Sequence, residues 1–367
     1  MVRKENTYIK VPTDSLKKVA EKLLEKHNVP PSHAEIVSDV LVTADLRGVE
    51  SHGIGRLFPY YISRLQKGWL NPRPNLQISS RFGAIFNMDA DNGLGHVACY
   101  KAMEKCLELA NQFGVGIGGI KNSNHFGIAG YYSMMALQEG MIGICISNTQ
   151  PLSMPTYSKK RLLGTNPFSI AVPAGKSQPF VLDMATSVVP IGRIEVYKRK
   201  GLRIPPEWGA DSRGIATSDP SEVFEGGGLF PLGGPAETAG YKGYGLSAAI
   251  DILSGVLTGS SFLAGVLNAR IRPEPCGVGH LVVALQVEAF MDIREFRERM
   301  DKFIGELKTA PLADGCDKIY LAGEKEFAQW EKNLQEGVPI HRTVWEELSA
   351  NCLRHNISLP ETNVTLP

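Results

Sequence analysis

The sequence lacks a surplus of either charge. Its 367 residues include 39 lysines and arginines against 38 aspartates and glutamates, for a formal net charge of +1. Proteins that bind nucleic acid usually carry a basic excess, so the composition does not favour that class of partner. Hydrophobic residues make up 43% and charged residues 21%, which excludes wholesale disorder. The length predicts two domains, or one large unit with a subdomain.

Cysteine is scarce, and long apolar runs are missing. The six cysteines form no CxxC pair, which predicts reduced, mostly buried thiols in a cytosolic protein. The least charged stretch, 247–269, contains Asp251 and many small residues, so we expect a buried helix and turn there rather than a membrane span. The polar opening, MVRKENTYIK, has none of the apolar character of a secretory signal.

Glycine and proline, by contrast, are plentiful at 38 and 23 residues, which predicts many turns and close backbone approaches. Apolar periodicity in the first 75 residues predicts helices over 13–28, from Ser32 to Gly48 and over 59–65. In the second of these, Glu35 is expected to complete a capping box with Ser32.

From about residue 78 the chain alternates between strand and helix patterns. We expect strands at 83–89, 115–120, 141–147, 167–173, 180–182 and 281–287, and helices at 95–113, 125–139, 189–200, 243–257, 293–307 and 343–355. Residues 205–240 are rich in glycine and proline and are predicted to form a long functional loop or flap. This order is typical of an α/β enzyme.

Three glycines, Gly114, Gly116 and Gly119, match the letters of the dinucleotide-binding GxGxxG pattern. A Rossmann fingerprint follows a strand and opens a helix, whereas these glycines follow a predicted helix and lie inside a predicted strand. We therefore interpret them as a helix C-cap and a strand with close neighbours, not as a pyrophosphate loop.

The segment from Gly48 to Arg56 gathers Ser51, His52 and Arg56 between two predicted helices. It is either a plain connection or a site. Neighbouring side chains diverge on an extended chain, so we expect Ser51 and His52 to face a common ligand rather than to form a hydrolase-type pair.

Three further positions are candidates for a site. His125 lies where a predicted strand meets a predicted helix, and a helix N-terminus would keep its ring neutral; the alternative is a capping or packing role. Asp183 ends an apolar strand and either caps the next helix or orients a histidine. Lys242 lies between tyrosine and glycine at a predicted helix start, which suits a phosphate or carboxyl group.

Taken together, the segments resemble the type-2 malate/L-lactate dehydrogenase family, which includes sulfolactate, ureidoglycolate and diketogulonate dehydrogenases and a cyclic imine reductase. The resemblance covers about residues 8–350. It is carried by ordered motifs: Ser51-His-Gly, Asn124-His-Phe-Gly, Gly164-Thr-Asn-Pro-Phe, Asp183-Met-Ala-Thr, Lys242-Gly-Tyr-Gly-Leu, Asp251-Ile-Leu-Ser-Gly and Gly323-Glu.

The resemblance implies an α/β (α+β) fold with a non-Rossmann cofactor domain, whose sheet is mixed and largely antiparallel, beside a helical domain. We expect an N-terminal helical part at 1–77, an NAD(P)-binding catalytic domain at 78–288, and a C-terminal helical part at 289–367 that packs with the N-terminal helices. Members of the family form homodimers, with the active site between domains and near the partner chain.

The resemblance also assigns residues. It implies Ser51 and His52 as polar active-site groups, Arg56 as the grip on the substrate carboxylate, and Tyr60 and His125 as pocket residues. Asp183 resembles a relay partner for a histidine. The residues in motifs that contact NAD or NADP are Thr165, Asn166, Asp183, Met184, Ala185, Lys242, Gly323 and Glu324.

The implied reaction moves a hydride between NAD(P)H and a small 2-oxo acid, malate or lactate first, with no metal. We expect His52 as general acid, because Asp183 would hold its ring, and His125 as the alternative donor or a carbonyl-orienting group. The competing functions are a cyclic imino-acid reductase of the same family and a catalytically silent metabolite-binding protein. The sequence does not fix the choice of hydroxy acid, NAD or NADP, or stereochemistry.

Overall fold

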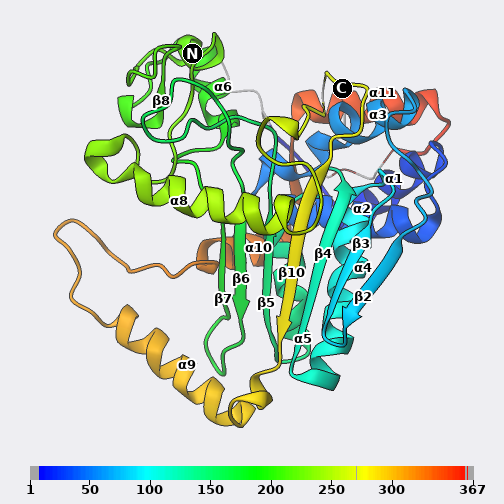
Figure 1. Ribbon diagram of the computed structural model, residues 1–367. Helices are drawn as coiled ribbons and strands as arrows, with labels where there is room; N and C mark the ends of the chain where they lie inside the picture. The colour runs from blue at the N-terminus through cyan, green and yellow to red at the C-terminus, as the bar shows by residue number, and fades with distance from the viewer. Residues whose placement is uncertain (1–7, 270, 360–361, 363–367) are drawn as a thin grey trace.

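A seven-stranded mixed sheet forms the centre of the computed structural model, which describes residues 8–269, 271–359 and 362 (Figure 1). Its order is β2-β3-β4-β10-β5-β6-β7. Only β3 and β4 are parallel; the other neighbours are antiparallel. The predicted non-Rossmann, largely antiparallel sheet is therefore confirmed. The strands are β2 (Gln77–Phe82), β3 (Ile85–Asp89), β4 (Val115–Ser123), β5 (Ile142–Ser147), β6 (Phe168–Val172), β7 (Phe180–Met184) and β10 (Val278–Leu285).

Helices cover both faces of this sheet. On one face lie α4 (Gly95–Phe113) and α5 (Ala129–Gln138), whose alanines, cysteines and other small side chains pack on β4, β5 and β10. Gly114 ends α4 with a positive φ of 79°, as a left-handed C-cap requires. Across the upper part of the other face in Figure 1 runs α8 (Gly240–Asp251), followed by a π-helical turn at Ile252–Val256.

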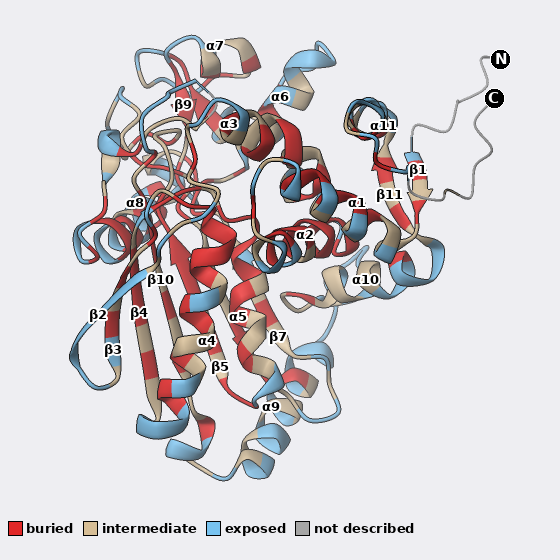
Figure 2. Ribbon diagram, turned by 90° about the vertical axis from the view of Figure 1, so that its right-hand side faces the viewer, coloured by how far each residue is buried: buried red, intermediate tan, exposed pale blue. Residues whose placement is uncertain are grey.

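A second core joins the two ends of the chain. It contains α1 (Thr13–Glu25), α2 (Pro31–Leu46), a π-helical turn (Leu57–Ile62), α3 (Ser63–Gln66) and α11 (Arg342–Arg354). Strand β1 (Tyr8–Val11) pairs antiparallel with β11 (Val338–His341) beside them. Figure 2 shows α2 buried along most of its length, because it lies between these elements and the sheet layer. Helix α10 (Glu324–Glu336) is joined to this core by Asn333, whose side-chain amide donates to the backbone carbonyls of Asp45 and Leu46.

One helix of the C-terminal part, α9 (Ile293–Lys308), does not belong to this second core. Helix α9 lies at the lower end of the sheet in Figure 1, where Asp301 accepts the backbone N–H groups of 175–177. The division of the chain at 77 and 288 stays a prediction, and the position of α9 differs from the predicted packing of 289–367 on the N-terminal helices.

The long segment 205–240 is more ordered than a plain flap. It holds α7 (Pro220–Phe224) and the strand pair β8 (Gly209–Ala210) and β9 (Gly228–Leu229), and it shares a small apolar core with α6 (Ile191–Arg199). No helix among the described residues is long and apolar enough to cross a membrane.

Two local predictions at helix starts are wrong. Helix α2 begins at Pro31 with Pro30 as its N-cap and no side-chain cap, so the capping box of Ser32 and Glu35 does not form. Proline at the first helical position supplies the fixed φ that a helix start needs. Helix α5 begins at Ala129 rather than at residue 125, because Gly127 adopts a positive φ of 81° and breaks the helical path before it.

Candidate active site

The candidate residues meet at one edge of the sheet. Strands β4, β5 and β7 run in the same direction, so their carboxyl ends lie together with the start of β6. His125 follows β4, Asp183 lies near the end of β7, and Asn166 precedes β6. The loop 50–56, which comes from the helical part, faces this edge, since the His52 and His125 rings stack with centroids 5.5 Å apart.

Ser51 and His52 are in direct contact. Residues 50–52 and 54–56 form two short 3₁₀ turns rather than an extended chain, and the Ser51 Oγ lies 2.9 Å from the His52 Nδ1. The expectation that the two side chains diverge is therefore wrong, because it assumed an extended chain. The Arg56 Nε donates to the Ser51 carbonyl, and its guanidinium lies 4.9 Å from the Tyr60 ring centroid.

His125 lies beside these groups in the connection before α5. Its ring centroid is 5.3 Å from that of Tyr60, and its Nδ1 lies 2.6 Å from the Tyr61 hydroxyl. Burial lowers the pKa of His125 well below its ordinary value, and the nearby His52 and Arg56 lower it further. Burial and Arg56 likewise lower the pKa of His52 to about 4. Both rings are therefore neutral at pH 7, through burial rather than through a helix dipole.

The buried carboxyl group of Asp45 binds the backbone of the 50–56 loop. The Asp45 carboxylate accepts the Ile54 N–H at 2.7 Å. A Cβ on Gly53 would lie 1.9 Å from Asp45 Oδ1, so only glycine fits at this approach. Burial raises the pKa of Asp45 to about 8, while the Ile54 N–H opposes the rise. The folded protein thus holds Asp45 protonated at neutral pH.

This pKa predicts a pH-dependent stability. The unfolded carboxyl ionises near pH 4 but the folded one near pH 8, so its contribution to stability is lost as the pH rises between these values. Between pH 5 and pH 8, wild type should lose on the order of a few kcal/mol of unfolding free energy relative to D45N. Urea titrations of both proteins at the two pH values measure this. Equal pH dependence in both would contradict the assignment.

Asp183 has a different partner from the predicted one. Its carboxylate accepts the Gly130 N–H at 2.7 Å, and among the described residues no hydrogen bond joins it to His52 or His125. The relay to a histidine is thus not formed, because α5 brings its own backbone N–H onto the end of β7. Protein atoms packed around Asp183 raise the pKa of its carboxyl group, with the Gly130 N–H and Arg47 opposing the rise, while the residue remains exposed to solvent. Its carboxyl group therefore faces solvent at the site.

The segments around Asn166, Met184 and Lys242 meet at this edge, whereas Gly323 and Glu324 lie beside the start of β7. The backbone carbonyls of Thr165 and Asn166 accept the Thr186 hydroxyl, which ties the segment after β7, with Met184 and Ala185, to the residues just before β6. The Asn166 side chain donates to the Ser247 carbonyl of α8, the helix that carries Lys242. Gly323 lies against Val181 with a φ of 91°, next to β7. Glu324 is held by Lys308 and Lys318, which lower the pKa of its carboxyl.

Two contacts at the site were missed in the sequence. The Tyr61 hydroxyl contacts His125, although the sequence pattern predicts only an apolar position of a helix at residue 61. The Thr149 hydroxyl accepts the Thr165 N–H at 2.9 Å, whereas no role was predicted for 148–150. Neither residue carries a sequence signal, because a π-helical turn and a long-range loop contact place them.

Comparisons with known proteins identify the family of this chain. The family model described as malate/L-lactate dehydrogenase matches residues 11–349. Malate dehydrogenase of Pyrococcus abyssi is 44% identical over 346 residues, 94% of each chain. L-Sulfolactate dehydrogenase of Methanocaldococcus jannaschii is 40% identical, over 92% of this chain and 94% of that one. The crystal structure of malate dehydrogenase from Entamoeba histolytica superposes with a TM-score of 0.92 at 34% identity, covering 96% and 100% of the two chains. The chain therefore belongs to the malate/L-lactate dehydrogenase family and is an oxidoreductase of that type.

Proposed function

We propose that the protein is an NAD(P)-dependent dehydrogenase that interconverts a small 2-hydroxy acid and its 2-oxo acid, with malate and oxaloacetate as the first pair to test. One juxtaposition carries the proposal: the Arg56 guanidinium beside the stacked rings of His52 and His125. A 2-oxo acid offers a carboxylate for the guanidinium and a carbonyl oxygen for an imidazole N–H. The names of the similar malate dehydrogenases support the choice of pair.

The edge of the sheet also fits a nicotinamide dinucleotide. Lys242 supplies a cation for the pyrophosphate, and among the described side chains no carboxylate pairs with it. Asp183 presents a solvent-facing carboxylate for ribose hydroxyls, and the buried Ser247 hydroxyl has no partner in the described part of the chain. Thr165, Asn166, Met184, Ala185, Gly323 and Glu324 complete the proposed contacts. When bound, the reduced nicotinamide supplies the hydride that the carbonyl carbon accepts.

The side chains of the pocket then orient the substrate and handle its proton. Arg56 holds the carboxylate and turns the carbonyl toward the histidines. We assign the donor to His125 instead of His52, because the predicted Asp183 support for His52 is not formed, whereas the proton position on His125 is defined by its neighbours. His52, whose Nδ1 contacts the exposed Ser51 hydroxyl, provides the path by which a proton returns from solvent.

Turnover of a substrate panel tests the function. Oxaloacetate, pyruvate, sulfopyruvate and a cyclic imino acid are offered with NADH and with NADPH, and the loss of reduced cofactor is followed by absorbance. We expect a 2-oxo acid to give the highest kcat/KM. Preference for the imine would favour the reductase alternative. Binding of cofactor without turnover of any compound would favour the silent binding protein.

We also propose that the protein forms a homodimer through α8 and the π-helical turn after it. This stretch exposes a run of apolar side chains: Leu246, Ile252, Leu253, Val256 and Leu257. Contiguous exposed apolar surface of this kind marks interaction sites. The same helix carries Lys242, so a partner seated there would lie next to the proposed cofactor site.

A charge on this surface should separate the two chains. Leu257 is 65% exposed, and L257D is expected to sediment at the 40.0 kDa of one chain while wild type sediments at twice that mass. Leu353 on α11 is 69% exposed and gives the matched control, L353D, which should remain dimeric. A monomeric wild type, or dissociation by L353D alone, would place the interface elsewhere or remove it.

The cytosolic location stays part of the proposal. All six cysteines are unpaired, and five of them are buried, which suits a reducing compartment.

A further inference from the structure

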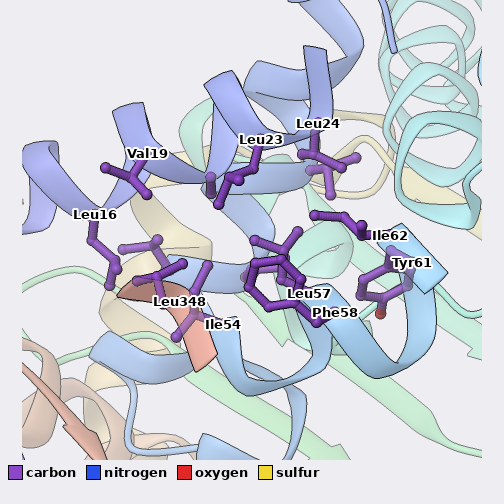
Figure 3. Close-up of a cluster of buried hydrophobic side chains, with 14 of the residues drawn as sticks. Leu16, Val19, Leu23, Leu24, Ile54, Leu57, Phe58, Tyr61, Ile62 and Leu348 are labelled. Carbon is purple, nitrogen blue, oxygen red and sulfur yellow. The ribbon is translucent and has the colours of Figure 1, made fainter. Parts of the chain in front are cut away.

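Tyr61 carries a hydroxyl group inside an apolar core, at the boundary with the active site. Its side chain is 2% exposed and packs with Leu57 and Ile62 in the cluster drawn in Figure 3, where its hydroxyl oxygen lies at the edge of the cluster. That hydroxyl lies 2.6 Å from the Nδ1 of His125. The deep burial means that water cannot replace this contact without opening the core.

The π-helical turn at Leu57–Ile62 places Tyr61 there. In a regular α-helix, neighbouring residues point about 100° apart and only one of two adjacent tyrosines reaches a given ring. Here the ring centroids of Tyr60 and Tyr61 lie 5.3 Å and 6.0 Å from that of His125. Such turns with widened hydrogen bonding are frequent at functional sites.

The contacts of Nδ1 define the tautomer of His125. The Gly127 N–H donates to this nitrogen at 3.3 Å, and a backbone N–H has no lone pair with which to accept. Nδ1 therefore holds a lone pair, and the Tyr61 hydroxyl at the same atom also donates. In the neutral ring the hydrogen must then lie on Nε2, on the opposite side from the buried tyrosine.

We propose that Tyr61 is a positioning residue, which donates to Nδ1 so that His125 presents its Nε2–H to the oxygen of the substrate carbonyl. The inference rests on the proposed function, since it takes the substrate to be a carbonyl compound. The stronger of the two contacts on Nδ1 comes from Tyr61, because 2.6 Å is a short hydrogen bond and 3.3 Å a long one.

Other groups around His125 have contacts of their own. His52 stacks on the His125 ring, the Arg56 guanidinium lies over the Tyr60 ring, and the ring nitrogens of His280 contact the hydroxyls of Ser123 and Ser147. His96 meets the Tyr61 ring edge to face at 4.7 Å, and neither of its ring nitrogens has a hydrogen-bond partner among the described residues. It supports the tyrosine ring by packing.

Nitrogen NMR of ¹⁵N-histidine-labelled protein tests the proposal without turnover. Of the eight histidines, the signal of His125 is the one absent in H125Q. In wild type we expect the hydrogen on Nε2 alone, whereas a hydrogen on Nδ1 would overturn the proposal before any tyrosine variant is made. In Y61F we expect a mixture of the two tautomers. An unchanged signal in Y61F would also overturn it.

Kinetics with a matched control separate positioning from stability. Y61F should lower kcat for 2-oxo acid reduction on the order of tenfold, the effect of losing one hydrogen bond, with cofactor Kd unchanged. Y131F removes another hydroxyl, which binds Asp39 away from the pocket, and should leave kcat and the His125 tautomer as in wild type. Equal loss of kcat in both variants would contradict a positioning role. Absence of turnover in wild type would instead refute the proposed function, while the spectra would still report on Tyr61.

Discussion

Replacing Arg56 with lysine should lower kcat/KM for the 2-oxo acid by about 10- to 150-fold, which corresponds to roughly 1.5–3 kcal/mol for a charge-assisted hydrogen bond. The guanidinium is planar and offers two parallel N–H donors to a carboxylate, whereas the lysine ammonium is a point charge. In the structure Arg56 is also held by the Ser51 carbonyl and by the face of Tyr60, two contacts that a lysine does not reproduce. The measurement is steady-state reduction at fixed, saturating cofactor.

A control variant and a cofactor-binding measurement show whether the loss in R56K comes from the contact with the substrate carboxylate. R294K changes an exposed arginine on α9, at the far end of the sheet, and should keep kcat/KM at the wild-type value. The Kd for cofactor should be unchanged in R56K, because the loss concerns the substrate. Wild-type kcat/KM in R56K would remove Arg56 from the substrate site.

Replacing the histidines should produce the largest losses. H125Q is expected to lower kcat for reduction by about 10²- to 10⁴-fold, the range for loss of a positioned proton donor. The loss should persist at every pH at which the protein is folded, because glutamine cannot donate a proton to the carbonyl oxygen at any pH. H52Q should lose less kcat, since His52 acts on the proton path and not at the carbonyl.

The opposite pattern would exchange the two roles. If H52Q lost far more kcat than H125Q, the proton donor would be His52, as the sequence alone favoured. Both variants are compared with S51A, which leaves both rings in place but removes the hydroxyl 2.9 Å from the His52 Nδ1. S51A should slow proton return, with a smaller loss of kcat than H125Q.

Regular elements could be predicted from the sequence because their patterns are local. The predicted helix at 95–113 matches α4 residue for residue, since glycine stands at both ends of its apolar stripe. Helix α10 and the β1–β11 pair were missed. Helix α10 is largely polar with a single fully buried position, Asn333, and β1 and β11 are four residues each and pair across more than 300 residues of sequence.

The identity of the site residues could be predicted, but several of their contacts could not. Ser51, His52, Arg56 and His125 lie together as the motifs indicated. The partner of Asp183 is a backbone N–H of α5, which leaves no trace in the residue types. The direction of Tyr61 depends on a π-helical turn, whose extra residue shifts side chains by an amount that apolar periodicity does not report.

Isotope transfer tests the central claim most directly. The protein is incubated with oxaloacetate, or with the best 2-oxo acid of the panel, and a reduced nicotinamide cofactor whose transferable hydrogen is deuterium. Mass spectrometry and proton NMR then locate the label in the hydroxy acid. The account predicts one deuterium on the carbinol carbon and none elsewhere, in wild type and, more slowly, in Y61F. A hydroxy acid without deuterium at that carbon, or no product in wild type with any compound of the panel, would contradict it.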